Sequence, residues 1–66
     1  MPSAVIRHFH HDAATSRLLI VFQTGRRYVY EGVPQGVAEQ LRRSRSKGEF
    51  FNANIRDNYR CQRVED

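Results

Sequence analysis

The sequence predicts an α+β domain, in which a three-stranded antiparallel meander is followed by two helices packed on one face of the sheet. Two observations support this prediction. Up to Glu31, short runs of β-branched and aromatic residues alternate with turn formers, a pattern typical of strands. From Gln35 onward the apolar residues recur with helical spacing instead. The order of the two patterns indicates that the sheet comes first and the helices cover it.

Three strands are expected before Gly32. Residues 4–10, AVIRHFH, form a weak first strand, and the turn formers of HDAATS follow it. Residues 17–23, RLLIVFQ, form the strongest strand because they combine β-branched and aromatic side chains over a common strand length. A tight turn at Thr24-Gly25 then leads into a third strand over residues 26–31, RRYVYE.

Two helices are expected after Pro34, which suits the first turn of a helix. The first covers residues 35–47 and ends where Gly48 takes a left-handed conformation. The second covers residues 49–59. Each helix has one apolar side: Val37, Ala38 and Leu41 in the first, and Phe51, Ile55 and Tyr59 in the second.

The register of the second and third strands decides where Tyr28 and Tyr30 point, because a one-residue slip moves side chains to the other face. With a two-residue loop, both tyrosines lie on the outer face, where their rings could stack on bases. With a three-residue loop over residues 23–25, they join the core. We favour the second register, because Gly25 supplies the left-handed residue of such a loop and Thr24 resists the positive φ of the alternative.

That register leaves an apolar patch on the outer face of the sheet. The patch consists of Leu19, Val21 and Val29, and charged side chains flank it. A cluster of this kind is typical of a surface that binds a protein partner or a second copy of the chain. A protein-interaction or self-association module is therefore the alternative to the function considered next.

The charge balance favours a polyanionic partner. Eleven Lys and Arg stand against seven Asp and Glu, which gives a formal net charge of +4, and Lys47 is the one lysine among these cations. Arginine binds phosphate with two parallel hydrogen bonds. The expected function is a small non-catalytic module that binds nucleic acid or another polyanion through a basic helical surface. Its predicted contacts are Arg42, Arg43, Lys47, Arg56 and Arg60.

Enzymatic and metal-dependent functions find little support. His8 and His10 would share one strand face, but a structural zinc site needs four ligands, and Cys61 is the only further Cys or His apart from His11. No base is spaced to activate a nucleophile, and no glycine-rich phosphate loop is present. We therefore expect no catalysis, no cofactor and no bound metal.

The 66 residues are expected to form one domain over residues 1–66. One cysteine excludes an internal disulfide, and no apolar run is long enough for a signal peptide or a membrane span. These features predict a cytoplasmic protein without a membrane partner.

Two spaced motifs run through the chain: Leu18-x-Ile20-x-Phe22-x-x-Gly25-x-x-Tyr28-x-Tyr30-x-x-Val33-Pro34 and Ser46-Lys47-Gly48-x-x-Phe51-Asn52-x-x-Ile55-Arg56-x-x-Tyr59. Together they strongly resemble the KTSC domain family, small bacterial domains named after the C-terminal end of some lysyl-tRNA synthetases. The resemblance implies RNA binding by analogy. The chain departs from the family pattern at His11, where a tyrosine is usual, and at Arg60-Cys61-Gln62, where a proline is common.

The resemblance draws attention to one set of residues: Tyr28, Tyr30, Ser46, Lys47, Gly48, Asn52 and Arg56. Both a structural and a functional role are open for those in the second motif. Gly48 and Asn52 suit helix ends, and Ser46 and Arg56 could brace the turn between the helices.

Overall fold

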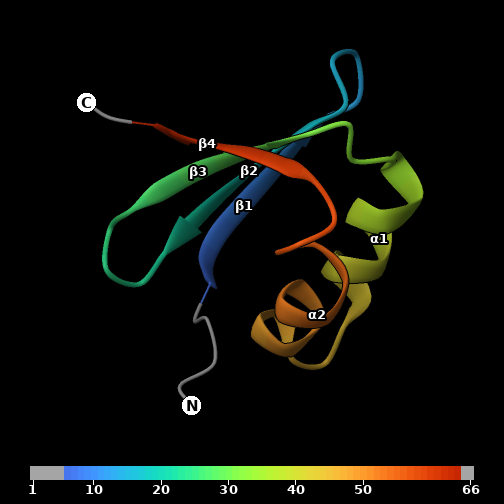
Figure 1. Cartoon of the computed structure of the whole chain (residues 1–66). Helices are drawn as coiled ribbons and strands as arrows, with labels where there is room; N and C mark the ends of the chain where they lie inside the picture. Colours follow the sequence, from blue (N-terminus) through green and yellow to red (C-terminus); the bar gives the residue numbers. More distant parts are fainter. Residues whose placement is uncertain (1–5, 65–66) are drawn as a thin grey trace.

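The computed structural model describes residues 6–64. The described elements are β1 (Ile6–Asp12), β2 (Arg17–Phe22), β3 (Arg27–Glu31), α1 (Gln35–Arg43), α2 (Lys47–Asn54) and β4 (Arg60–Val64). The strands form one antiparallel sheet in the order β1-β2-β3-β4, and both helices lie on one side of it (Figure 1). The predicted α+β class and the strand-to-helix order are confirmed, with β4 as an addition.

The first strand ends two residues later than predicted. Its predicted first residues, 4 and 5, lie outside the described part of the chain. At its other end β1 continues to Asp12, whose side-chain Oδ1 accepts a hydrogen bond of 3.0 Å from the backbone N–H of Ala14. This local bond starts the turn into β2, so Asp12 serves both as the last strand residue and as the turn former that the sequence suggests.

The hairpin between β2 and β3 has the predicted three-residue loop. Gly25 has φ +91° and donates to the Phe22 carbonyl at 2.9 Å, while the Phe22 N–H donates to the Arg26 carbonyl at 2.9 Å. Ile20 consequently pairs with Tyr28, and Leu18 pairs with Tyr30. Both tyrosines therefore lie on the core side, as predicted.

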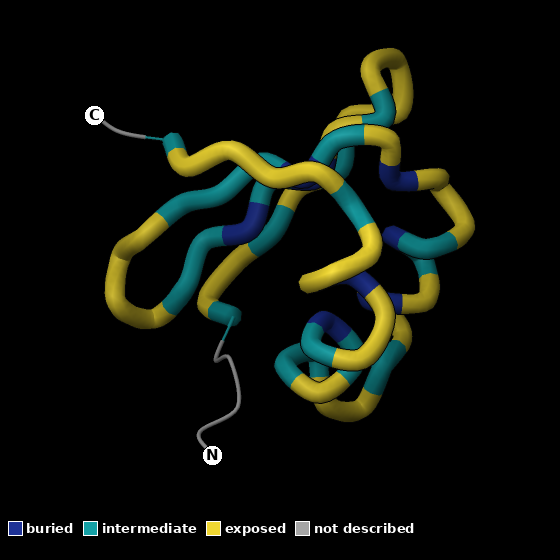
Figure 2. Tube along the Cα trace, in the orientation of Figure 1, coloured by how far each residue is buried: buried dark blue, intermediate teal, exposed yellow. Residues whose placement is uncertain are grey.

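The core lies between the sheet and the helices (Figure 2). Phe51 of α2 reaches the sheet and makes edge-to-face contacts with Phe22 and Tyr30, with ring centroids 5.5 and 5.3 Å apart. Phe22 in turn contacts Tyr28 at 5.7 Å, so four rings form a continuous chain. Edge-to-face pairs add to the effect of burial alone. The buried cluster comprises Leu18, Ile20, Tyr30, Val33, Leu41, Phe51 and Ile55.

The break between the helices differs from the prediction. α1 ends at Arg43, and Ser44 turns the chain out of the helix while its Oγ donates to the Leu41 carbonyl at 2.7 Å. Ser46 then begins α2 by accepting from the Glu49 N–H at 3.3 Å. The prediction that Gly48 closes the first helix is wrong: Gly48 lies in the first turn of α2. Hydroxyl caps, rather than a left-handed glycine, separate the two helices.

The second helix is shorter than predicted and a strand follows it. α2 ends at Asn54, and the backbone N–H groups of Ile55 and Arg56 both donate to the Phe51 carbonyl at 2.9 Å. After a turn, β4 pairs with β3 from Arg60 onward. None of the helices in residues 6–64 is long and apolar enough to cross a membrane.

Candidate nucleic-acid interface

The junction between α1 and α2 concentrates positive charge. Residues 42–47 contain four cations and no carboxylate: Arg42, Arg43, Arg45 and Lys47. The first two form the last turn of α1, and Lys47 begins α2. The three arginines are exposed and Lys47 is half-buried. We call these four residues the junction cluster.

Arg42 is the most constrained member of the junction cluster. Its Nε donates to Glu39 Oε1 at 2.9 Å, and its Nη2 lies 2.8 Å from the same oxygen and 3.2 Å from Oε2. An exposed pair three residues apart on a helix contributes little stability. It does offset the charge of Arg42, so Arg43, Arg45 and Lys47 present most of the available positive charge.

The first turn of α2 adds backbone donors to this cluster. The Ser46 hydroxyl occupies the Glu49 N–H, and the Phe50 N–H donates to the Ser46 carbonyl at 3.0 Å. The N–H groups of Lys47 and Gly48, like those of any first helical turn, have no partner within the helix. They point along the positive end of the helix dipole, and Gly48 has no side chain to keep an anion away from the backbone. The structure therefore gives Ser46 the predicted bracing role.

Arg56 lies at the other end of α2, beside Tyr30. Tyr30 is 5% exposed. Burial raises the pKa of its hydroxyl far above the ordinary value, the adjacent Cys61 thiol raises it further, and the positive charge of Arg56 lowers it in part. The Tyr30 hydroxyl is consequently a neutral group whose neighbours come from β4 and from the turn after α2.

This environment predicts alkaline sensitivity. An unfolded chain releases the tyrosine proton near pH 10, whereas folded Tyr30 retains it to higher pH. Above that pH the folded state binds more protons than the unfolded state, so the free energy of unfolding falls as pH rises. Urea denaturation between about pH 8 and about pH 11 should show this fall, and Tyr30→Phe should reduce its slope. An unchanged slope in Tyr30→Phe would contradict the buried-hydroxyl interpretation.

Arg60 occupies a different place from the one predicted. The spacing predicts that it projects from the second helix, which is wrong, because Arg60 is the first residue of β4 and pairs with Glu31. Glu31 lies on the sheet face away from the helices, so Arg60 lies there too. The five predicted contact residues therefore occupy three places: Arg42, Arg43 and Lys47 at the junction, Arg56 beyond α2, and Arg60 on the outer sheet face. Arg45, which the prediction omits, belongs to the junction cluster.

Asn52 has an unexpected position in the second motif. It lies inside α2 rather than at a helix end, so the helix-end interpretation of this residue is wrong. Its side-chain Oδ1 is buried and has no hydrogen-bond partner among the described residues. Nothing in the structure explains this unsatisfied oxygen.

His11 has a structural role. Its Nε2 lies 2.9 Å from the Val33 carbonyl oxygen, which can only accept, so Nε2 carries the proton. The bond ties the end of β1 to the loop before α1.

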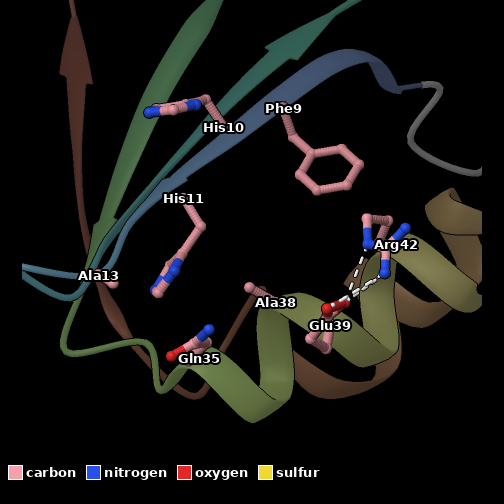
Figure 3. Close-up of a pocket in the computed structure, with 8 residues that line it drawn as sticks. All are labelled: Phe9, His10, His11, Ala13, Gln35, Ala38, Glu39 and Arg42. Carbon is pink, nitrogen blue, oxygen red and sulfur yellow. Dashed lines mark hydrogen bonds and ion pairs between the residues drawn. The ribbon is translucent and has the colours of Figure 1, made fainter.

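A hollow of about 340 Å³ opens beside His11, between β1 and α1, with Phe9 and His11 on one wall and Glu39 and Arg42 on the other (Figure 3). Because Glu39 offsets Arg42, this hollow offers an anion little net attraction.

His8 and His10 share a face of β1, as predicted, because they pair with Val21 and Leu19 on the outer side of the sheet. Among residues 6–64, no three His, Cys, Asp or Glu side chains come close enough together to hold a metal ion. The single cysteine, Cys61, is a free thiol in β4.

Comparison with known families places this fold. The family model of the KTSC domain matches residues 2–59. The chain belongs to the KTSC domain family. A crystal structure of a KTSC domain protein from Yersinia pestis has a TM-score of 0.90, with 28% sequence identity over 98% of this chain and 92% of that chain. The resemblance that the two spaced motifs indicate is therefore confirmed.

A curated relative shows the KTSC sequence within a larger protein. A lysine–tRNA ligase from Nostoc punctiforme (strain ATCC 29133 / PCC 73102) is 34% identical over 61 residues, which are 92% of this chain. The chain spans only 11% of the length of that ligase. A segment similar to this chain thus forms part of a much longer protein.

Proposed function

We propose that this KTSC domain is a non-catalytic module that binds RNA through the junction cluster. The observation that supports the proposal most directly is that Arg43, Arg45 and Lys47 border the first turn of α2, where the N–H groups of Lys47 and Gly48 have no partner within the helix. Charged side chains and backbone donors that face the same place are the usual elements of a phosphate site. Arg56, in the turn that follows α2, is positioned for a separate phosphate.

The relative supports RNA as the class of nucleic acid. A lysine–tRNA ligase acts on an RNA, and a segment similar to this chain forms part of it. Transfer RNA combines flexible loops with a high density of phosphates, which suits a surface that offers charge without a reading element. Tyr28 and Tyr30 take no direct part in this proposal, because Tyr30 is buried and Tyr28 is half-buried in the aromatic chain. Arg60 is also left out, because it lies on the opposite face of the sheet.

A backbone amide NMR titration with transfer RNA and with a DNA duplex tests the proposal. At low salt we expect the amides of residues 43–48 to shift with transfer RNA, and those of the β2–β3 turn, residues 23–26, to stay in place. Between about 50 mM and about 200 mM salt the affinity should fall by roughly tenfold or more if two or more phosphate contacts form. The absence of any shift in residues 42–48 at low salt would refute binding, and equal shifts with the duplex would refute the preference for RNA.

A further inference from the structure

The outer face of the sheet is uncovered. Both helices pack against the opposite face, as Figure 1 shows. Leu19, Val21 and Val29 lie on this outer face and are half-buried, and β4 adds Val64 to them. The predicted apolar patch is therefore present in the structure, and the fourth strand extends it.

A row of charged side chains borders this patch. Asp12 of β1 pairs with Arg17 of β2, Arg17 pairs with Glu31 of β3, and Glu31 pairs with Arg60 of β4. Cross-strand partners share a face, so all four side chains lie on the outer side. Across the four strands the signs read minus, plus, minus, plus. β4 supplies the fourth charge, Arg60, which makes the alternation of signs complete across the sheet.

We propose that the outer sheet face binds a second copy of this chain. The two copies are related by a two-fold axis that lies between the two sheets, runs parallel to the strands and passes over the line between β2 and β3. Such an axis exchanges β1 with β4 and β2 with β3, while each row keeps its height along the strands. Asp12 then faces Arg60 of the second copy, and Arg17 faces Glu31 of the second copy. Every charge in the row meets its opposite, which is the self-complementarity that an isologous interface requires.

Of the apolar positions, Leu19 and Val29 obey the same symmetry, whereas the axis sets Val21 and Val64 against Arg27 and His8 of the other copy. In the next row along the strands, Leu19 and Val29 occupy the central strands β2 and β3. The axis therefore places Leu19 of one copy against Val29 of the other, at the centre of the contact. Two sheets that pack face to face cross at about 30° because of their twist, and the long arginine side chains at the edge can follow that crossing.

The surface is small. Four strands spaced about 4.8 Å apart, with three outward side chains each, cover roughly 300 Å² per copy, well below the roughly 800 Å² per partner of a stable complex. The dimer should therefore be weak and should form only at high protein concentration. A net charge of +4 on each copy also opposes association. The outer row itself is neutral, so moderate salt should weaken the long-range repulsion without a large loss of the contact pairs.

Sedimentation equilibrium on three variants tests the axis. In R60D, two like-charged contacts arise, because position 60 of each copy meets Asp12 of the other. D12R likewise creates two like-charged contacts. Each single substitution should weaken association by about tenfold, since like charges placed together cost more than an exposed pair contributes. D12R/R60D should restore association, because opposite charges again face each other between the copies.

The double variant also separates this dimer from a role of the row within one chain. In D12R/R60D both substituted side chains lie beside like charges on their own sheet, at Arg17 and at Glu31. If the row serves only the folded monomer, association should not recover in the double variant. A lower melting temperature is expected in either case, because the like charges within each chain are the same. Loss of the Asp12–Ala14 hydrogen bond is common to D12R and the double variant, so it cancels in their comparison.

A measurement on the unaltered chain avoids any folding defect of the variants. In a mixture of isotope-labelled and unlabelled chains at millimolar concentration, filtered NMR spectra should show contacts between Leu19 methyls of one copy and Val29 methyls of the other. A chain that stays monomeric at that concentration, in both low and moderate salt, overturns the proposal. A dimer without these methyl contacts overturns the outer face as its interface.

Discussion

Phe51→Ala should destabilise this domain more than most single substitutions would. The Phe51 side chain is 2% exposed and links α2 to the sheet through its edge-to-face contacts with Phe22 and Tyr30. Truncation of a buried phenylalanine costs about 3–5 kcal/mol. A chain of this size has a free energy of unfolding of roughly 3–10 kcal/mol, so the substitution removes about 30% of it or more. Thermal and urea denaturation followed by circular dichroism would measure the loss.

The neighbouring Phe50 provides a matched control. It lies on the same helix, is half-buried and packs at the margin of the core. Phe50→Ala should therefore cost clearly less than Phe51→Ala. If Phe51→Ala is too unfolded to measure, Phe51→Leu and Phe50→Leu allow the same comparison, because leucine retains part of the buried volume. Equal losses at the two positions would contradict the central place of Phe51 in the core.

The local chemistry of the hairpin was sufficient to predict the register of β2 and β3 and the direction of the two tyrosines. Gly25 could supply a positive φ and Thr24 could not, and this selected the three-residue loop. The register of β2 and β3 followed from the loop, and with it the inward direction of Tyr28 and Tyr30. A short-range preference at one glycine thus determined the faces of two strands.

The helix junction and β4 were harder to predict because competing signals were present. Gly48 is a common residue just after a helix, whereas the actual boundary depends on the hydroxyls of Ser44 and Ser46, which are equally compatible with exposed helix positions. β4, with the sequence RCQRV, has no apolar alternation, because it is an edge strand whose first four side chains are exposed. Its pairing rests on backbone hydrogen bonds, which leave little trace in a sequence.

The missed strand explains why the basic surface was only partly predicted. The sequence identifies the cations, but their faces depend on which element each one occupies. The prediction placed three of these cations correctly at one site, because the break between the helices lies among them: Arg42 and Arg43 end α1, and Lys47 begins α2. Arg60 lies on the outer sheet face, away from the predicted surface, because it begins β4 instead of continuing α2.

The double charge reversal R43E/K47E should weaken RNA binding by at least about tenfold at low salt. It should also make the plot of log affinity against log salt less steep by about 1.4, because each lost contact to a single strand contributes about 0.7 to the slope. The two substitutions have opposed effects on the fold: a glutamate disfavours the last turn of α1 and favours the first turn of α2. Binding isotherms at several salt concentrations would measure both quantities, and thermal melts would confirm that the variant remains folded.

The matched control, R26E/R63E, has the same change in net charge but alters another part of the molecule. Arg26 lies in the β2–β3 turn and Arg63 lies near the end of β4, both exposed and far from the α1–α2 junction (Figure 1). Reduced net charge weakens the general attraction in both variants equally. Only R43E/K47E should also reduce the salt slope, because only its substitutions remove phosphate contacts. Equal slopes in the two variants would mean that RNA is attracted by the net charge of the domain and does not bind at the junction cluster.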